Sequence, residues 1–249
     1  MAQSKKFISP GAWFSMLYPA DWNEFEDGEG SFLFYNPSEW TGNFRISAYK
    51  GNAMYGREVT RQELKDNPSA VSVKIGSLAC AYSKEMFEEG AYYTSHLWIT
   101  GVDDVAFECS FTVSKGASVA EAEAVIASLE IRKEGVKYPA ELIPVRLSEI
   151  YQINEAFEWV TTTVKEQLKK DFQGMEEDLD SMQQVIDSGT IGPKKKEAWL
   201  SFGIAICVIL ANEVDGLEWM TLIDGNREAP VLQNLTTGEW IDPMKLVWS

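Results

Sequence analysis

Hydrophobic and polar residues alternate in several short runs of the first half of the chain, the pattern of half-buried β-strands. These runs are residues 14–18, 31–36 and 44–51. In the last run Phe44, Ile46 and Ala48 fall on one face. Asp27-Gly28 is a strong turn signal between the first two runs. The stretch 14–36 is therefore predicted to be the first hairpin of the fold, with its aromatic side chains in the core.

The middle of the first half combines helix-start signals with further β-rich segments. Thr60 is followed three residues later by Glu63, which predicts a capping box and a short helix that Asn67-Pro68 ends. Four β-rich runs between residues 71 and 113 then predict an antiparallel meander. Ser118 and Glu121 form a second capping box, after which apolar residues recur at helical spacing. The order predicted is strands, short helix, strands, long helix.

The second half changes character near residue 135. Residues 135–147 contain Gly135, Pro139 and Pro144 without periodicity, which indicates a linker. Two helical faces follow, then the apolar segment 198–211, then runs that read as a β-meander ending in WIDPMKLVW. At 14 residues the apolar segment is shorter than the roughly 18–20 residues that span a bilayer, so it predicts a buried helix.

These patterns together predict an α+β protein of two domains. Residues 1–134 are expected to form an antiparallel sheet flanked by helices. Residues 148–249 are expected to form about three helices followed by a small antiparallel sheet. No internal repeat relates the halves.

Composition and charge restrict the classes of partner that the protein is expected to bind. The 22 basic and 38 acidic residues give a net charge of −16, and both halves are acidic. Such a surface repels nucleic acid and anionic lipid and attracts a basic protein. Three widely spaced cysteines favour a reducing compartment, and Pro10, Gly11 and Pro19 interrupt the N-terminal apolar segment, so we expect mature chain in the cytoplasm.

The chain offers few residues for chemistry. His96 is the single histidine, so a multi-histidine metal site is not expected, and a dyad with Cys109 is the one nucleophile arrangement that strand pairing would allow. Phosphate-loop, nucleotide-binding and EF-hand spacings are absent, and the acidic runs 24–30 and 176–180 read as a turn and a solvated helix face. We therefore predict no cofactor, no metal and no catalytic residues.

Two groups of residues are candidates for partner contacts. Three tryptophans lie beside predicted loops, and exposed tryptophans are frequent anchors of protein interfaces. They are Trp13, Trp22 and Trp40. Lys194, Lys195 and Lys196 sit at a predicted helix start, where cations oppose the helix dipole and so hint at a contact with an anion or a partner.

The first half opens with an aromatic strand followed by Pro-x-x-Trp, in FSMLYPADW. After it come SFLFYN, FRISAYKG, a short helix, a meander and the AEAVIASLEI helix. In this order of elements, residues 7–134 resemble the PsbP protein of the oxygen-evolving complex and the Mog Ran-binding proteins. The resemblance implies an α-β-α sandwich and a binding or assembly role without an active site. The Gly203-containing helix, GLEWMTLID and the closing run with Pro243 resemble an uncharacterised bacterial family, a domain of unknown function.

Three hypotheses of function follow. The leading one is a non-enzymatic module that binds or assembles with another, basic protein, and an immunity protein against a basic toxin is its narrowest form. The second is a binder of a small ligand or carbohydrate in the cleft between the domains. The third is an enzyme that uses His96 with a carboxylate or Cys109.

Overall fold

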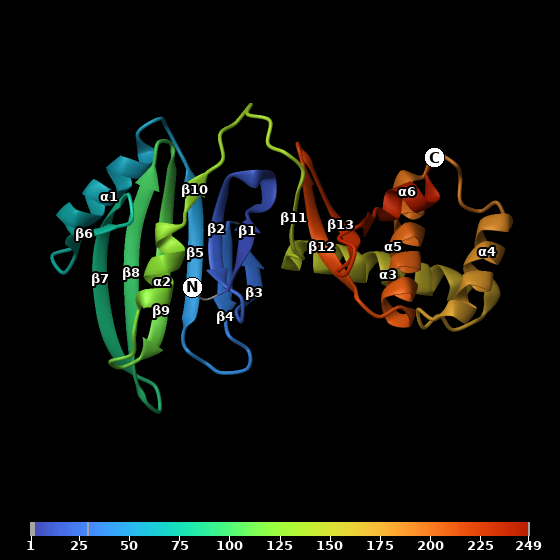
Figure 1. Cartoon of the computed structure of the whole chain (residues 1–249), viewed down its shortest axis with the longest axis horizontal. Coiled ribbons are helices and arrows are strands. Elements are labelled where there is room, and N and C mark those ends of the chain that lie inside the picture. The colour runs from blue at the N-terminus through green and yellow to red at the C-terminus, as the bar shows by residue number, and fades with distance from the viewer. Residues whose placement is uncertain (1–2, 29, 249) are drawn as a thin grey trace. The chain divides into compact units, whose positions relative to one another are not determined.

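The chain forms two compact units in a computed structural model, Met1–Lys137 and Tyr138–Ser249 (Figure 1). The structure describes residues 3–28 and 30–248, without the side chains of residues 26–28. Each unit has its own hydrophobic core. The fold is mixed α and β with antiparallel sheets, as the residue pattern predicts.

The first unit is built mainly of strands. They are β1 (Ser4–Ile8), β2 (Phe14–Pro19), β3 (Asn23–Gly28), β4 (Ser31–Tyr35), β5 (Asn43–Lys50), β6 (Val71–Ile75), β7 (Leu78–Glu88), β8 (Tyr92–Val102), β9 (Val105–Ser114) and β10 (Glu130–Ile131). Its helices are the 3-10 turn η1 (Pro10–Ala12), α1 (Tyr55–Asp66) and α2 (Ala120–Ala127).

Seven of these strands form one sheet in the order β3-β4-β5-β9-β8-β7-β6. The predicted meander is confirmed, because β6 to β9 pair in sequence and antiparallel. Alternation also holds: Phe44, Ile46 and Ala48 are buried on one face of β5 while Arg45 and Ser47 lie on the other.

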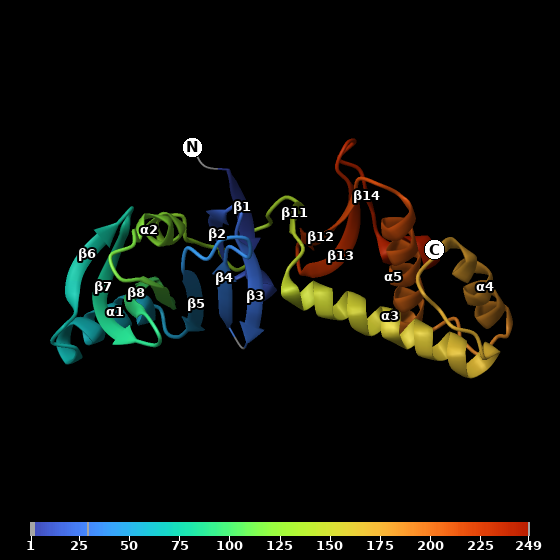
Figure 2. The ribbon, with the colours of Figure 1, turned by 90° about the horizontal axis from the view of Figure 1, so that it is seen from below.

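The two faces of the large sheet have different covers. The small sheet β1-β2-β10 and α2 share a core with one face, and α1 packs on the other (Figure 2). A Cβ at Gly56 of α1 would collide with the backbone at Gly101 and Val105, so glycine at this crossing lets the helix approach the sheet closely. We call the face that carries α1 the outer face.

Three local predictions in this unit are wrong, and one of them is the long helix after Ser118, because α2 has 8 residues and α1 has 12. The stretch 14–36 is not one hairpin: β2 pairs with β1 and β10, while β3 pairs with β4 in the other sheet. The expected turn residues Asp27-Gly28 still belong to β3, with Gly28 opposite Ser31, so the connection falls at Glu29-Gly30, and Glu29 is outside the described residues.

The helix predicted to begin at Thr60 begins earlier. α1 starts at Tyr55, and Thr60 lies inside it with its hydroxyl donating to the Gly56 carbonyl at 3.0 Å. A mid-helix threonine satisfies its hydroxyl in this way, so the S/T-x-x-E spacing alone does not mark a helix start. The end is as predicted, at Asn67 before Pro68.

The second unit places helices before most of its strands. Its elements are β11 (Glu141–Pro144), α3 (Leu147–Leu168), the 3-10 turn η2 (Glu176–Asp178), α4 (Leu179–Asp187), α5 (Lys196–Glu213), β12 (Leu217–Asp224), β13 (Arg227–Asn234), β14 (Trp240–Ile241) and α6 (Pro243–Val247). The strands form one antiparallel sheet in the order β11-β12-β13-β14.

Two boundaries of this unit differ from the prediction. Residues 141–144 of the predicted linker form β11 on β12, because a proline that cannot donate a ladder bond is tolerated at the end of an edge strand. The closing run is a strand only at Trp240–Ile241. Asp242 then caps α6 by accepting from the Met244 N–H at 3.1 Å, and Pro243 occupies the first turn.

The apolar segment 198–211 lies within α5, and Phe202, Ala205 and Ile209 are buried in the core of the second unit. Over the residues described, no helix combines the length and the apolar character needed to cross a membrane.

Candidate functional site

The cysteines lie in the cores. Cys80, Cys109 and Cys207 are all free and buried. Burial raises the pKa of each thiol, to about 12 for Cys207, which disfavours the thiolate that a nucleophile or a metal ligand needs.

His96 is engaged with neighbouring rings. Its Nδ1 lies 2.8 Å from the Tyr82 hydroxyl, and its ring stacks on Trp98. Strand register puts Phe111 opposite His96 and Trp98 opposite Cys109, so the two candidate dyad residues face different partners. Burial, with a smaller contribution from the Lys84 charge, lowers the pKa of His96 and keeps the imidazole neutral.

The acidic runs show no metal geometry where they are described. Among the residues whose placement is described, no three His, Cys, Asp or Glu side chains gather as they would around a metal ion. In the run 176–180, Asp178 instead accepts backbone N–H groups of Gln173, Gly174 and Met175 at 2.8–3.1 Å and so orders the turn before α4.

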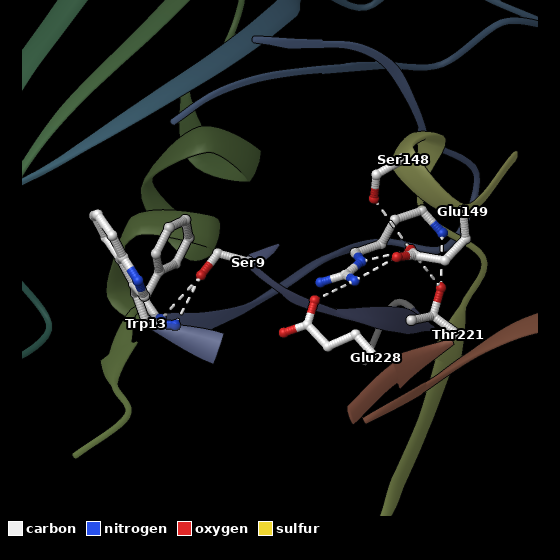
Figure 3. A network of polar contacts seen from close by, with 8 residues as sticks. Ser9, Trp13, Ser148, Glu149, Thr221 and Glu228 are labelled. Carbon is white, nitrogen blue, oxygen red and sulfur yellow. Dashed lines mark hydrogen bonds and ion pairs between the residues drawn. The ribbon is translucent and has the colours of Figure 1, made fainter. Parts of the chain in front are cut away.

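The second unit holds a buried ionic network at the start of α3. Arg146, 2% exposed, donates to both carboxylate oxygens of Glu149 at 2.7 and 2.6 Å and to Glu228 at 2.6 Å. Thr221 donates to Glu149 at 2.9 Å and accepts from the Arg146 backbone N–H at 3.1 Å, and Ser148 adds a bond at 3.2 Å (Figure 3). These bonds tie α3 to β12 and β13.

The charged groups of this network are paired with one another. Burial lowers the pKa of the Arg146 guanidinium, but its bonds to Glu149 and Glu228 outweigh that effect and raise it. The two partners Thr221 and Glu228 lie far along the chain, so no local pattern signalled the network. Its role is to hold the fold of the second unit.

The predicted contact residues differ in their exposure. Trp22 is wrong as a contact residue, because it is fully buried, stacks on Phe111 at 5.8 Å and packs near Phe44. Trp13 is 41% exposed, and its backbone N–H donates to the Ser9 hydroxyl at 3.0 Å (Figure 3). Lys194, Lys195 and Lys196 are exposed where α5 begins.

Trp40 is 42% exposed on a loop that is held in place from several sides. Its indole N–H donates to the Asn43 side chain at 2.7 Å. At the loop start the Asn36 side chain accepts the backbone N–H groups of Ser38 and Glu39 at 2.8 and 3.2 Å and donates to Asp21 at 2.8 Å. We call residues 36–43 the Trp40 loop.

Gly42 closes this loop. Its φ of +137° is outside the range that side chains favour, and a Cβ there would overlap the rings and methyls of Phe111 and Val113. Phe111 is the ring on which Trp22 stacks. The loop therefore rests on the core, which restrains the exposed tryptophan.

Trp40 belongs to a row of three contiguous rings. Its ring meets Tyr93 edge-on, with centroids 5.8 Å apart and planes at 83°. Tyr93 in turn stacks on Phe87, opposite it on β7, at 5.6 Å and 27°. Phe87 is 38% exposed and Tyr93 is half-buried. We call Trp40, Tyr93 and Phe87 the aromatic row.

The aromatic row lies on the outer face, at the end of the sheet away from α1. Gly101, which packs against α1, and Tyr93 lie at opposite ends of β8 and on the same face by alternation. The next residues inward across the sheet are polar: Glu85, Ser95, Thr112 and Asn43 lie opposite one another in register.

The charges beside the row are mainly acidic. Glu85 shares its face two residues from Phe87, and Glu39 directly precedes Trp40, and both are exposed. Lys84 points to the other face, opposite His96. Just beyond the end of β9, Lys115 lies over the Tyr92 ring, with its Nζ 5.4 Å from the centroid.

Comparisons with known proteins bear on the whole chain. A crystal structure from Bacteroides thetaiotaomicron VPI-5482 at 1.50 Å is 74% identical, covers 99% of this chain and 91% of its own, and has a TM-score of 0.95. The solution structure of cyanobacterial PsbP from Synechocystis sp. PCC 6803 covers 53% of this chain and 94% of its own at 12% identity and TM-score 0.30. LpqN of Mycobacterium tuberculosis, described as involved in cell envelope biogenesis, covers 53% and 91% at 14% identity and 0.31.

The PsbP protein, which residues 7–134 resemble in sequence, is thus among the structures similar to part of this chain. A search of curated proteins finds no match. Residues 178–249 match a second domain of unknown function, DUF3806. Residues 2–154 match the family described as domain of unknown function DUF3805, and this chain belongs to that family.

Proposed function

We propose that the protein is a non-enzymatic binding or assembly module whose partner is another protein and whose contact surface includes the aromatic row. The observation that carries the proposal is a contiguous set of three rings, two of them well exposed, on a sheet face and a restrained loop. Aromatic side chains at a rigid site are the usual hot spots of protein interfaces because they bury a large area at a small entropic cost.

The charge of the chain supports a basic partner. A net charge of −16 speeds the association of a cationic protein at low salt and opposes binding to nucleic acid. An immunity protein that neutralises a basic toxin is the narrowest form of this proposal. The cytoplasm is the compartment we propose, on the strength of three free, sparse cysteines.

The state of the candidate nucleophiles supports a role without catalysis. The thiols are buried with raised pKa values, and the Nδ1 of His96 is engaged with Tyr82. The third hypothesis of the sequence, an enzyme built on His96 and Cys109, therefore ranks below binding.

The proposal is tested by affinity capture from a lysate of the source organism at low and high salt. The bait is the tagged full chain, beside a Trp40→Ala/Phe87→Ala variant and a Trp240→Ala control of similar exposure on β14. We expect one stoichiometric protein that the wild type and the control retain, that the double variant loses, and that high salt weakens. Equal retention by all three baits, or nothing on any of them, would refute the proposal.

A further inference from the structure

The corner between Trp40 and Tyr93 has a shape that selects its occupant. The two rings stand at 83° with centroids 5.8 Å apart, so they form two walls at a right angle rather than one flat platform. A flat platform suits a sugar ring. Here the edge of one ring already contacts the other, so a planar side chain can lie only on an exposed ring face, beside the edge of the second ring. A guanidinium group is planar and stacks on aromatic faces.

The charges beside the corner select a cation. Glu85 lies on the outer face two residues from Phe87, Glu39 directly precedes Trp40 in the chain, and both are exposed. The electron-rich faces of Trp and Tyr rings attract cations, and nearby carboxylates add to that attraction. At the same end of β8, on the other face, the Lys115 ammonium lies 5.4 Å over the Tyr92 ring.

We propose that the aromatic row, with Glu39 and Glu85, is the docking site for an arginine-bearing segment of the partner protein. One arginine lies on an exposed ring face at the corner of Trp40 and Tyr93, and its charge is matched by the carboxylates. This inference rests on the proposed function and deepens it by naming the chemistry of the partner.

The test uses a synthetic probe on the full chain. The probe is an acetylated, amidated peptide of alternating arginine and glycine, and its matched control carries citrulline, the neutral isostere, in place of arginine. Affinities are measured by isothermal titration calorimetry at one fixed low salt concentration. Far-UV circular dichroism verifies that each variant is folded.

Five variants separate the site from general acidity and from the loss of any exposed tryptophan. Trp40→Ala removes one wall of the corner and Trp40→Phe keeps a ring there. Glu85→Gln removes one carboxylate, and Glu166→Gln makes the same change of charge on the exposed part of α3. Trp240→Ala, on β14, is the control for the loss of an exposed tryptophan, because Trp240 is 37% exposed.

We expect the arginine peptide to bind the wild type and the citrulline peptide not to bind detectably. Trp40→Ala should weaken binding roughly two- to thirtyfold, the range expected for a cation–π contact from exposed to desolvated. Trp40→Phe should recover part of that loss, and Glu85→Gln should weaken binding up to about fivefold. The two controls should change the affinity less than twofold.

Several results would overturn the inference. Equal binding of the citrulline peptide would show that the site does not select a cation, and an equal loss in Glu166→Gln would show binding to general acidity. Trp40-dependent binding of a neutral oligosaccharide such as maltohexaose in place of the peptide would assign the row to carbohydrate. A captured partner that needs Trp40 but that the arginine peptide does not displace would end this inference and leave the proposed function standing.

Discussion

Replacing Arg146 by methionine should destabilise the second unit more than any loss of a surface ion pair. The substitution keeps an unbranched apolar stem but removes three bonds of 2.6–2.7 Å, to Glu149 and Glu228. Glu149 is 6% exposed, so its carboxylate then stays buried without the guanidinium, while Thr221 and Ser148 still donate to it. Breaking a buried pair by removing one partner costs about 3–5 kcal/mol, against roughly 0–1 kcal/mol for an exposed pair.

A second variant identifies the cause. Arg146→Met/Glu149→Met removes both buried charges, and apolar replacement of a buried pair is often neutral. We therefore expect the double variant to recover at least about 2 kcal/mol of the loss, a coupling typical of side chains in one network.

Urea unfolding at pH 7 measures both variants, and hydrogen exchange of the α3 amides assigns the transition to the second unit, because a chain of two units need not unfold in one step. Lys165→Met is the matched control, since its ion pair with Asp171 is long, at 3.8 Å, and exposed. A loss below about 1 kcal/mol in Arg146→Met, or a double variant less stable than the single one, would refute the reasoning.

Three further predictions concern other parts of the molecule. Gly203→Ala places a methyl group against the Pro243 carbonyl of α6 and should cost about 1–3 kcal/mol in urea unfolding. Gly192→Ala would meet only the Lys195 Cγ, at an ordinary contact distance of 4.0 Å, and should cost less than about 0.5 kcal/mol. The pKa of His96 is lowered in the folded protein, so its contribution to the free energy of unfolding is complete above the unfolded pKa of 6.5 and is lost as the pH falls from there toward the folded pKa. Between pH 7.5 and 5.5 the urea midpoint should therefore fall more steeply for the wild type than for His96→Gln. Asn36→Ala should speed the amide exchange of Ser38 and Glu39, while the free energy of unfolding falls by no more than the cost of a lost hydrogen bond, about 1–3 kcal/mol. Unchanged exchange would mean that Asn36 does not order the loop.

The sequence predicts those features that depend on neighbouring residues. Strands β4, β5 and β7 to β9 follow from alternation because the side-chain period of a strand is local, and the end of α1 follows from Asn67-Pro68. The choice of strand partner is not local. The aromatic run at β2 fits a hairpin with β4 equally well, and its pairing with β10 depends on packing across the whole first unit.

The candidate site also contains both residues that the local sequence identifies and residues that only strand pairing brings together. Trp40 can be predicted as a contact residue from its place beside a loop. Tyr93 and Phe87 cannot, because only the register of β7 and β8 brings them together beside the Trp40 loop. Trp22 has the same loop-side position as Trp40 and is nevertheless fully buried, since its burial is decided by Phe44 and Phe111 on other strands.

The segment PADW, part of the motif that carries the family resemblance, contacts the residues that hold the Trp40 loop in place. Asp21 accepts the Asn36 amide that starts the Trp40 loop, and Trp22 stacks on Phe111, against which Gly42 closes the loop. An exposed tryptophan on a free loop would lose mobility on binding and so lower the affinity. Because this loop is already ordered by bonds to its own core, most of that cost falls on folding and little on association. The exposed ring and its buried support are therefore ordered together, and Asp21 and Trp22 of the motif supply part of that support.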